Sequence, residues 1–178
     1  MPEFRIDTSK NKDIEIMRGT PVGTILLLCG YIYSARDAAH KKIADSIIEG
    51  KNLFDFKDKI LYYMGPTPAR PGNPIGSCGP TSSYRMDSYL EMMLKLGVSA
   101  TIGKGDRDSS VLDIIKLYKA PYLTAVGGAS AYLAKKVKSS KVVLFPELGP
   151  EAVVELLVDQ FPVIVSYDIN ERSIFDGR

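Results

Sequence analysis

The sequence predicts a single-domain α/β fold, in which helices cover a central sheet, on three observations. Apolar segments of strand length, rich in β-branched residues, alternate with amphipathic segments of helix length. The strand segments are nearly continuous in apolar residues, which is typical of sheets that are covered by helices. The 178 residues, with 45% apolar and 25% charged side chains, suit one globular domain over residues 1–178.

The first elements are a strand over residues 24–33 and a helix that follows it. Ser34 is a candidate N-cap for this helix and Gly50 a candidate terminator. Residues 59–65 predict a second strand. The Pro- and Gly-rich residues 66–80 then predict a loop, because this composition excludes regular structure.

The second half continues the alternation of strands and helices. A stripe of Met and Leu predicts a helix from about residue 83 to 96. The lysine-rich residues 135–141 are expected at a helix end and turn, because cations favour helix C-termini. The other predicted elements are strands at 98–103, 122–126, 142–145 and 162–168, and helices at 109–118, 127–137 and 150–158.

Composition excludes several classes of function. A formal net charge of +2 does not indicate a polyanion partner such as nucleic acid. The longest apolar run, "TILLLCGYIY", is too short to span a bilayer, and the N-terminus lacks a secretory h-region, so a cytoplasmic protein is expected. Cys29 and Cys78, with His40 as the single histidine, cannot enclose a zinc site or an iron–sulfur cluster alone.

The stretch "GSCGPTSSYRMDSY", residues 76–89, is typical of an anion site. Its glycines and proline leave backbone amides facing outward just before a predicted helix, whose N-terminus attracts anions. Thr81 and Arg85, one turn apart, would then suit a carboxylate substrate. The alternative is an ordinary Thr or Ser N-cap, with Arg85 paired to Asp87 or Asp106.

Two further cations lie where strands meet loops, and ligands of α/β sheets bind at such places. Arg36 falls in the first turn of a predicted helix, where the helix dipole disfavours a cation unless an anion is bound there. A pair with Asp37 or a neighbouring carboxylate explains it equally. Lys104 lies between two glycines at the end of a predicted strand. It is either a charge exposed for a ligand or an ordinary lysine of a turn. His40 lies one turn after Asp37, which favours a local helix contact.

The motifs "IYSARDAAHKK", "GPTPARPGNPIGSCGPTSSYRMDSY", "IGKG", "GGASA" and "ELGPEA" occur in a recognisable order. From about residue 14 to its end, the chain resembles the β subunit, or C-terminal domain, of the class I fumarase and L-tartrate dehydratase family of iron–sulfur hydro-lyases. Cys78 stands where that family usually has alanine, and Ser82 replaces a frequent second threonine.

The resemblance implies a swivelling β/β/α domain and a reversible hydration or dehydration of a C4 dicarboxylate, with fumarate and malate as first choice and L-tartrate as second. It implies a 4Fe–4S cluster held by cysteines of an α subunit, where the metal acts as a Lewis acid, and no metal ligands on this chain. The expected assembly is a dimer of α–β pairs.

The resemblance also implies roles for individual residues. Thr81 matches the family's proton-transfer threonine, whereas Arg36, Arg85 and Lys104 match its substrate-binding cations. The supporting residues that it implies are His40, Gly79, Ser82 and Asp87. A different class of function stays open, a non-catalytic carboxylate-binding or regulatory domain of the same fold. An assembly subunit is favoured if the cations are salt-bridged within the chain.

Overall fold

The computed structural model describes residues 3–51 and 54–176, and it is a mixed α/β structure, which confirms the predicted class. Strands alternate with helices through most of the chain, and two 3-10 helices, η1 and η2, interrupt the pattern. In order, the elements are β1 Glu3–Asp7, α1 Asn11–Arg18, β2 Ile25–Ser34, α2 Asp37–Ile48, β3 Ile60–Tyr62, η1 Ser83–Met86, α3 Asp87–Lys95, β4 Ala100–Gly103, α4 Ser110–Tyr118, β5 Tyr122–Thr124, α5 Ser130–Lys136, β6 Val137–Leu144, η2 Pro146–Glu151 and β7 Val153–Tyr167.

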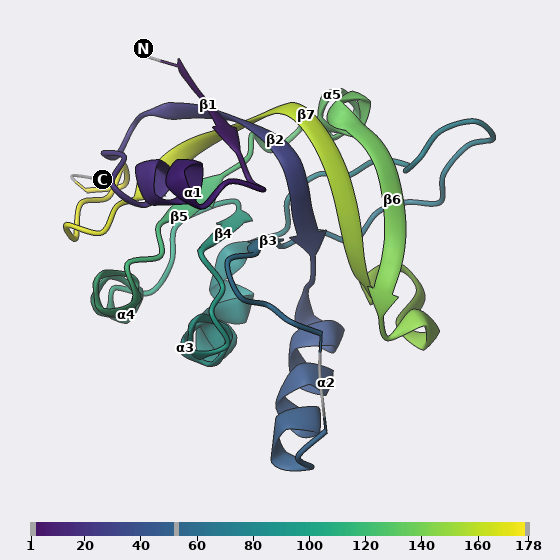
Figure 1. Ribbon diagram of the computed structural model, residues 1–178, viewed down its shortest axis with the longest axis horizontal. Coiled ribbons are helices and arrows are strands. Elements are labelled where there is room, and N and C mark those ends of the chain that lie inside the picture. Colours follow the sequence, from purple (N-terminus) through teal and green to yellow (C-terminus); the bar gives the residue numbers. More distant parts are fainter. Residues whose placement is uncertain (1–2, 52–53, 177–178) are drawn as a thin grey trace.

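The sheet is parallel from β1 to β5 and is completed by one long antiparallel strand (Figure 1). Strands β1, β2, β3, β4 and β5 are hydrogen-bonded neighbours in that order. Strand β7 then pairs antiparallel with β5, with β6 and with β2. Because Ile164 of β7 faces both Ile25 of β2 and Thr124 of β5, the pairings from β2 around to β7 form a closed circuit.

Alternate residues of each strand point to opposite faces, so the sheet has one large apolar cluster on each face, besides a small third cluster of Ala35, Ala39 and Val153. In β3, Ile60 and Tyr62 join one cluster, in which Tyr62 packs edge-on against Phe161 of β7. Leu61 of the same strand, with Tyr63 after it, joins the second cluster, to which α2, α3 and α4 contribute. Figure 1 shows these three helices below the sheet, whereas α5 lies beside the upper part of β6 and β7.

Two predicted elements are wrong, the second of them only in part. Residues 150–158 do not form a helix, because their second part enters β7, where Val154, Leu156 and Val158 alternate with more exposed residues in a strand pattern. Residues 135–141 are a helix end as predicted, since Lys135 and Lys136 lie in the last turn of α5, but no turn follows it. They cross from α5 into β6, an edge strand whose exposed lysines oppose further strand pairing.

Several boundaries also differ from the predicted ones. Ser34 ends β2 and is not the N-cap of α2, which is Arg36. The predicted helix from residue 83 begins as η1 and becomes α-helical at Asp87. No helix within the described ranges has the length and apolar character that crossing a membrane requires. The swivelling arrangement of the domain stays a prediction.

Candidate functional site

The carboxyl ends of four parallel strands bring most of the predicted site residues to one edge of the sheet. Arg36 follows β2, Tyr63 follows β3 and Lys104 follows β4. The strands remain hydrogen-bonded to their ends, since the Ala35 amide donates to the Tyr62 carbonyl at 3.1 Å and the Ala125 amide to the Gly103 carbonyl at 2.9 Å. In α/β sheets, ligands bind outside the carboxyl ends of the parallel strands, which is this edge.

Backbone hydrogen bonds fasten Thr81 to this edge. Its amide donates to the Tyr63 carbonyl at 2.8 Å, and its carbonyl accepts from the Lys104 amide at 3.2 Å. The Ser83 amide then donates to the Lys104 carbonyl at 3.1 Å, which makes a short parallel pairing of Ser82 with Lys104. Residues 81 and 104, both predicted to act on substrate, are therefore neighbours.

The predicted helical relation of Thr81 and Arg85 is wrong, because Thr81 precedes η1, which begins at Ser83. The N-cap alternative also fails for Ser82, which is the N-cap residue but makes no side-chain cap hydrogen bond. Close approaches of glycine backbone shape the segment instead. A Cβ on Gly79 would lie 2.1 Å from Ser130 Oγ, and a Cβ on Gly103 would lie 1.9 Å from Ser83 Oγ.

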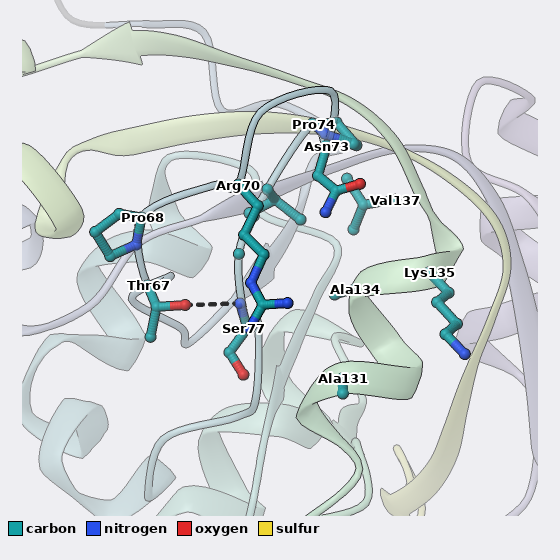
Figure 2. A pocket seen from close by; sticks show the side chains of 12 residues that line it. Thr67, Pro68, Arg70, Asn73, Pro74, Ser77, Ala131, Ala134, Lys135 and Val137 are labelled. Atoms are coloured by element: carbon teal, nitrogen blue, oxygen red, sulfur yellow. Dashed lines mark hydrogen bonds between the residues drawn. The ribbon is translucent and has the colours of Figure 1, made fainter.

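A groove of about 650 Å³ lies between the Pro- and Gly-rich loop and the α5–β6 junction (Figure 2). The loop is held in part by the Thr67 hydroxyl, which accepts from the Ser77 amide at 2.8 Å. Figure 2 shows Arg70 extended along the groove next to Ser77, with Ala134 on the α5 side. The residues that line the groove do not include Thr81 or the three predicted cations.

Arg36 is half-buried and makes an ion pair with Glu151 of η2, at 2.7 Å between Nη2 and Oε1. The other carboxylate oxygen of Glu151 accepts from the Ala38 amide at 2.9 Å. A Cβ on Gly65 would lie 3.0 Å from the Arg36 guanidinium carbon, so a larger residue there would displace the guanidinium. Arg36 therefore pairs with a residue far along the chain, and not with Asp37.

Arg85 is held by the carboxylate that Arg36 does not use. Its Nε lies 3.0 Å from Asp37 Oδ1, so the expected pairs with Asp87 and Asp106 are wrong. The Arg85 side chain is 46% exposed, and Lys104 is also exposed. The contacts therefore form two sets at the strand ends, the backbone pairing of Thr81 with Tyr63 and Lys104, and the two arginines with their carboxylate partners.

A buried ion pair that sequence reasoning missed lies beneath this edge. Arg107 Nε is 2.6 Å from Asp87 Oδ1, with the arginine side chain fully buried and the aspartate side chain 16% exposed. The guanidinium also donates to Thr101 Oγ1 and stacks near the rings of Tyr63 and Tyr122. Asp87, predicted as a supporting residue, therefore joins the start of α3 to the segment after Lys104.

His40 is fully buried below the same surface. Its Nδ1 lies 2.9 Å from the Arg36 carbonyl, to which it donates, and its ring packs edge-on against Tyr63. Burial lowers the pKa of His40 to about 4, partly opposed by the Arg36 carbonyl and by Asp37. The imidazole is therefore neutral at pH 7, and it adds no charge to the site.

A 4Fe–4S cluster does not fit the part of the chain that the structure describes. Its His, Cys, Asp and Glu side chains form no group that could hold a metal ion, and Cys29 and Cys78 are buried free thiols. Burial raises the pKa of Cys78 to about 12, which keeps it protonated, whereas a metal ligand must be a thiolate.

Comparisons with known proteins agree with one another. The family described as Fumarase C-terminus matches residues 2–177. The chain is 39% identical over 181 residues to "Putative L(+)-tartrate dehydratase subunit beta" of Methanocaldococcus jannaschii, which covers 98% of this chain and 91% of that protein. It is 39% identical over 158 residues to "Fumarate hydratase class I, anaerobic" of Escherichia coli strain K12, and 40% identical to "Fumarate hydratase 2" of Leishmania major.

These relatives differ in how much of their length the chain accounts for. The two fumarate hydratases match 87% of this chain, but the chain spans only 29% and 28% of their respective lengths. The tartrate dehydratase subunit, by contrast, is matched over nearly its whole length.

We expect Arg107→Gln to lower the free energy of unfolding by about 3–5 kcal/mol, because it leaves Asp87 as an uncompensated, largely buried charge. Urea unfolding at pH 7 measures the change. The matched control is Lys116→Gln, which removes an ion pair to Glu171 between side chains that are 59% and 41% exposed. That control should cost at most about 1 kcal/mol. Equal losses in the two variants would contradict a buried role for Arg107.

We also expect His40 to make the fold sensitive to acid. Because its folded pKa is depressed from 6.5 to about 4, the unfolded chain binds the proton more readily. The corresponding stability is present above pH 6.5 and is lost as the pH falls toward 4. The loss by pH 4 is about 3 kcal/mol.

The measurement is urea unfolding of the wild type and of His40→Gln at several values between pH 7 and 4. Carboxylates titrate in both proteins, so the difference between the two curves reports His40 alone. It should shrink or reverse toward pH 4. Parallel curves would show that His40 does not carry the dependence.

Proposed function

The chain belongs to the Fumarase C-terminus family, and from this premise we propose that it is the β subunit of an iron–sulfur hydro-lyase. The proposed reaction is the reversible hydration or dehydration of a C4 dicarboxylate. Fumarate and malate are the first proposed substrates, and the dehydration of L-tartrate to oxaloacetate is the second. Relatives with both kinds of name support the reaction class.

The observation that carries the proposal is the position of Thr81. Its backbone is bonded to the Lys104 amide, and the adjoining Tyr63 leads to Gly65, against which Arg36 packs. Arg85 is paired with Asp37, the residue that follows Arg36 in the chain. In this proposal, the Thr81 hydroxyl and the three cations act on one substrate, because a dicarboxylate needs cationic anchors for its two carboxylates and a group that transfers a proton.

In this proposal, Thr81 moves the proton on the carbon next to one substrate carboxylate. A threonine hydroxyl is a weak base in water, so its role depends on nearby positive charge that favours the alkoxide. Lys104 supports this role, because its amide is bonded to the Thr81 carbonyl and its side chain is exposed at the same edge.

The three cations bind the substrate carboxylates in this proposal. Each arginine uses one edge for its internal partner, and a guanidinium has further N–H donors in a planar fork that matches a carboxylate. Gly79 and Ser82 support the segment through their close contacts with Ser130 and Lys104, and Asp87 supports it through Arg107.

The proposed partner is an α subunit that holds the 4Fe–4S cluster. The near-complete match to a protein named as a β subunit supports a separate partner chain. The cluster would supply Lewis-acid chemistry at the substrate hydroxyl. A cytoplasmic dimer of α–β pairs is the proposed assembly, since cyclic dimers are the commonest closed arrangement.

The alternative is a non-catalytic carboxylate-binding or regulatory domain of the same fold. The internal pairs of Arg36 with Glu151 and of Arg85 with Asp37 favour it, because both arginines already have a carboxylate partner. They also favour a role in assembly. A neighbouring reading frame that encodes an α chain with three cysteines would favour the enzyme.

The test of the enzyme is reconstitution. The chain is co-expressed with a candidate α chain, loaded with iron and sulfide without oxygen, and assayed by fumarate absorbance and by a coupled assay for oxaloacetate. We expect turnover of fumarate and malate, or of L-tartrate. A loaded complex that turns over none of them would leave the binding domain as the better account.

Within the active complex, we expect Thr81→Ala to lower kcat by about 10²- to 10⁴-fold, the usual size of a general acid–base contribution. Substrate binding should persist, because the cations remain. Thr81→Ser is the matched control, since it keeps the hydroxyl and should retain most of the activity. If the alanine variant keeps wild-type kcat, Thr81 is not the proton-transfer residue.

A further inference from the structure

Four charged side chains form an alternating set at the N-terminus of α2. Arg36 is paired with Glu151 at 2.7 Å, and Arg85 is paired with Asp37 at 3.0 Å. The two pairs are adjacent, because Arg36 and Asp37 are consecutive residues. The set contains two positive and two negative charges, so within it the carboxylates balance the arginines.

Glu151 differs from an ordinary surface partner in how firmly it is held. It lies at the end of η2, 115 residues from Arg36, on the segment that joins β6 to β7 (Figure 1). Both of its oxygens are used, one by Arg36 Nη2 and the other by the Ala38 amide at 2.9 Å. Two bonds to two different groups fix the carboxylate in one orientation.

The Glu151 charge is also stabilised where it lies. The hydrogen bond from Arg36 lowers the pKa of Glu151, with smaller contributions from the Ala38 amide and from Arg85, against an opposing effect of burial. The side chains of Glu151 and Arg36 are 27% and 29% exposed, so solvent screens this pair less than a fully exposed one.

The Arg36 guanidinium is confined on its other side by Gly65. A Cβ at that position would lie 3.0 Å from the guanidinium carbon and from Nη1. The Glu151 carboxylate thus fixes one edge of the Arg36 guanidinium, and Gly65 limits its position on another side. The Arg36 Nε–H is buried and has no acceptor among the described residues.

We propose that Glu151 is a positioning residue, which holds Arg36 in the orientation that receives a substrate carboxylate. The inference rests on the proposed function of Arg36. Glu151 itself does not contact substrate; it fixes the guanidinium before binding, so less conformational entropy is lost when the carboxylate arrives. Asp37 of α2 is the carboxylate partner of Arg85, with one oxygen 3.0 Å from its Nε.

The kinetic test uses the α–β complex with Glu151→Gln, which keeps the shape and removes the charge. We expect KM to rise about tenfold, the size of one charge-assisted hydrogen bond, with kcat within about twofold. The control is Glu147→Gln, because Glu147 pairs with Lys42 across the same two elements, η2 and α2, but is 55% exposed. The control should leave both constants unchanged.

A second measurement does not depend on activity. In the full chain without its partner, the ε N–H NMR signal of Arg36, assigned by its loss in Arg36→Lys, should shift or broaden in Glu151→Gln. The same signal should be unchanged in Glu147→Gln. An inactive wild-type complex would overturn the proposed function alone, and this signal would still decide whether Glu151 positions Arg36.

If Glu151→Gln does not fold, Gly65→Ala provides the second variant, because its methyl group meets the guanidinium from the opposite side. It should move the same NMR signal and raise KM. The proposal is overturned if the variant that folds leaves the Arg36 signal as in the wild type, or if KM in an active complex equals that of the Glu147 control.

Discussion

The candidate site depends on one interaction, the backbone pairing that joins residues 81–83 to the ends of β3 and β4. Through it, Thr81 and Lys104 become neighbours although a long loop without regular structure precedes Thr81. The pairing continues the hydrogen bonds of the sheet past Gly103, where only the absence of a side chain lets Ser83 approach. The Gly- and Pro-rich composition of this region is therefore explained by close backbone contact.

Buried polar contacts support this pairing from below. The Tyr122 hydroxyl lies 2.9 Å from Ser83 Oγ and donates to the Gly105 carbonyl at 2.8 Å, so β5 supports both sides of the pairing. Arg107 and Asp87 make a second connection between the same two segments. Buried groups of this kind are costly unless they are satisfied, which makes the local arrangement specific.

The sequence was sufficient for the class of fold and for most of the central strands, because nearly continuous apolar runs identify buried strands. It was insufficient for residues 150–158, whose Val and Leu spacing fits both a helix and a strand; pairing with β2 and β6 decides in favour of the strand. The second part of β6 was predicted as a strand, but its lysine-rich first part was not, since an edge strand has no need to be apolar.

For the site, the resemblance and the strand-end rule indicated Arg36, Lys104 and the segment around Thr81, and the structure places them on one edge. Their partners were beyond prediction. Glu151 is 115 residues from Arg36, and no local spacing relates the two. Arg107 follows Lys104 closely, but only its complete burial distinguishes it from a surface arginine. Long-range pairing and burial are properties of the folded chain alone.

The charges at this edge bear on how much of a site the chain supplies. Arg36 and Arg85 are balanced by Glu151 and Asp37, Arg107 is balanced by Asp87, and His40 is neutral at pH 7. Lys104, the remaining predicted cation, takes part in none of these pairs, so they do not offset its charge. A dicarboxylate carries two negative charges, so its complete neutralisation requires positive charge from outside this set. In the proposed α–β enzyme, the paired arginines of this chain therefore orient the substrate carboxylates. Further positive charge comes from the second chain.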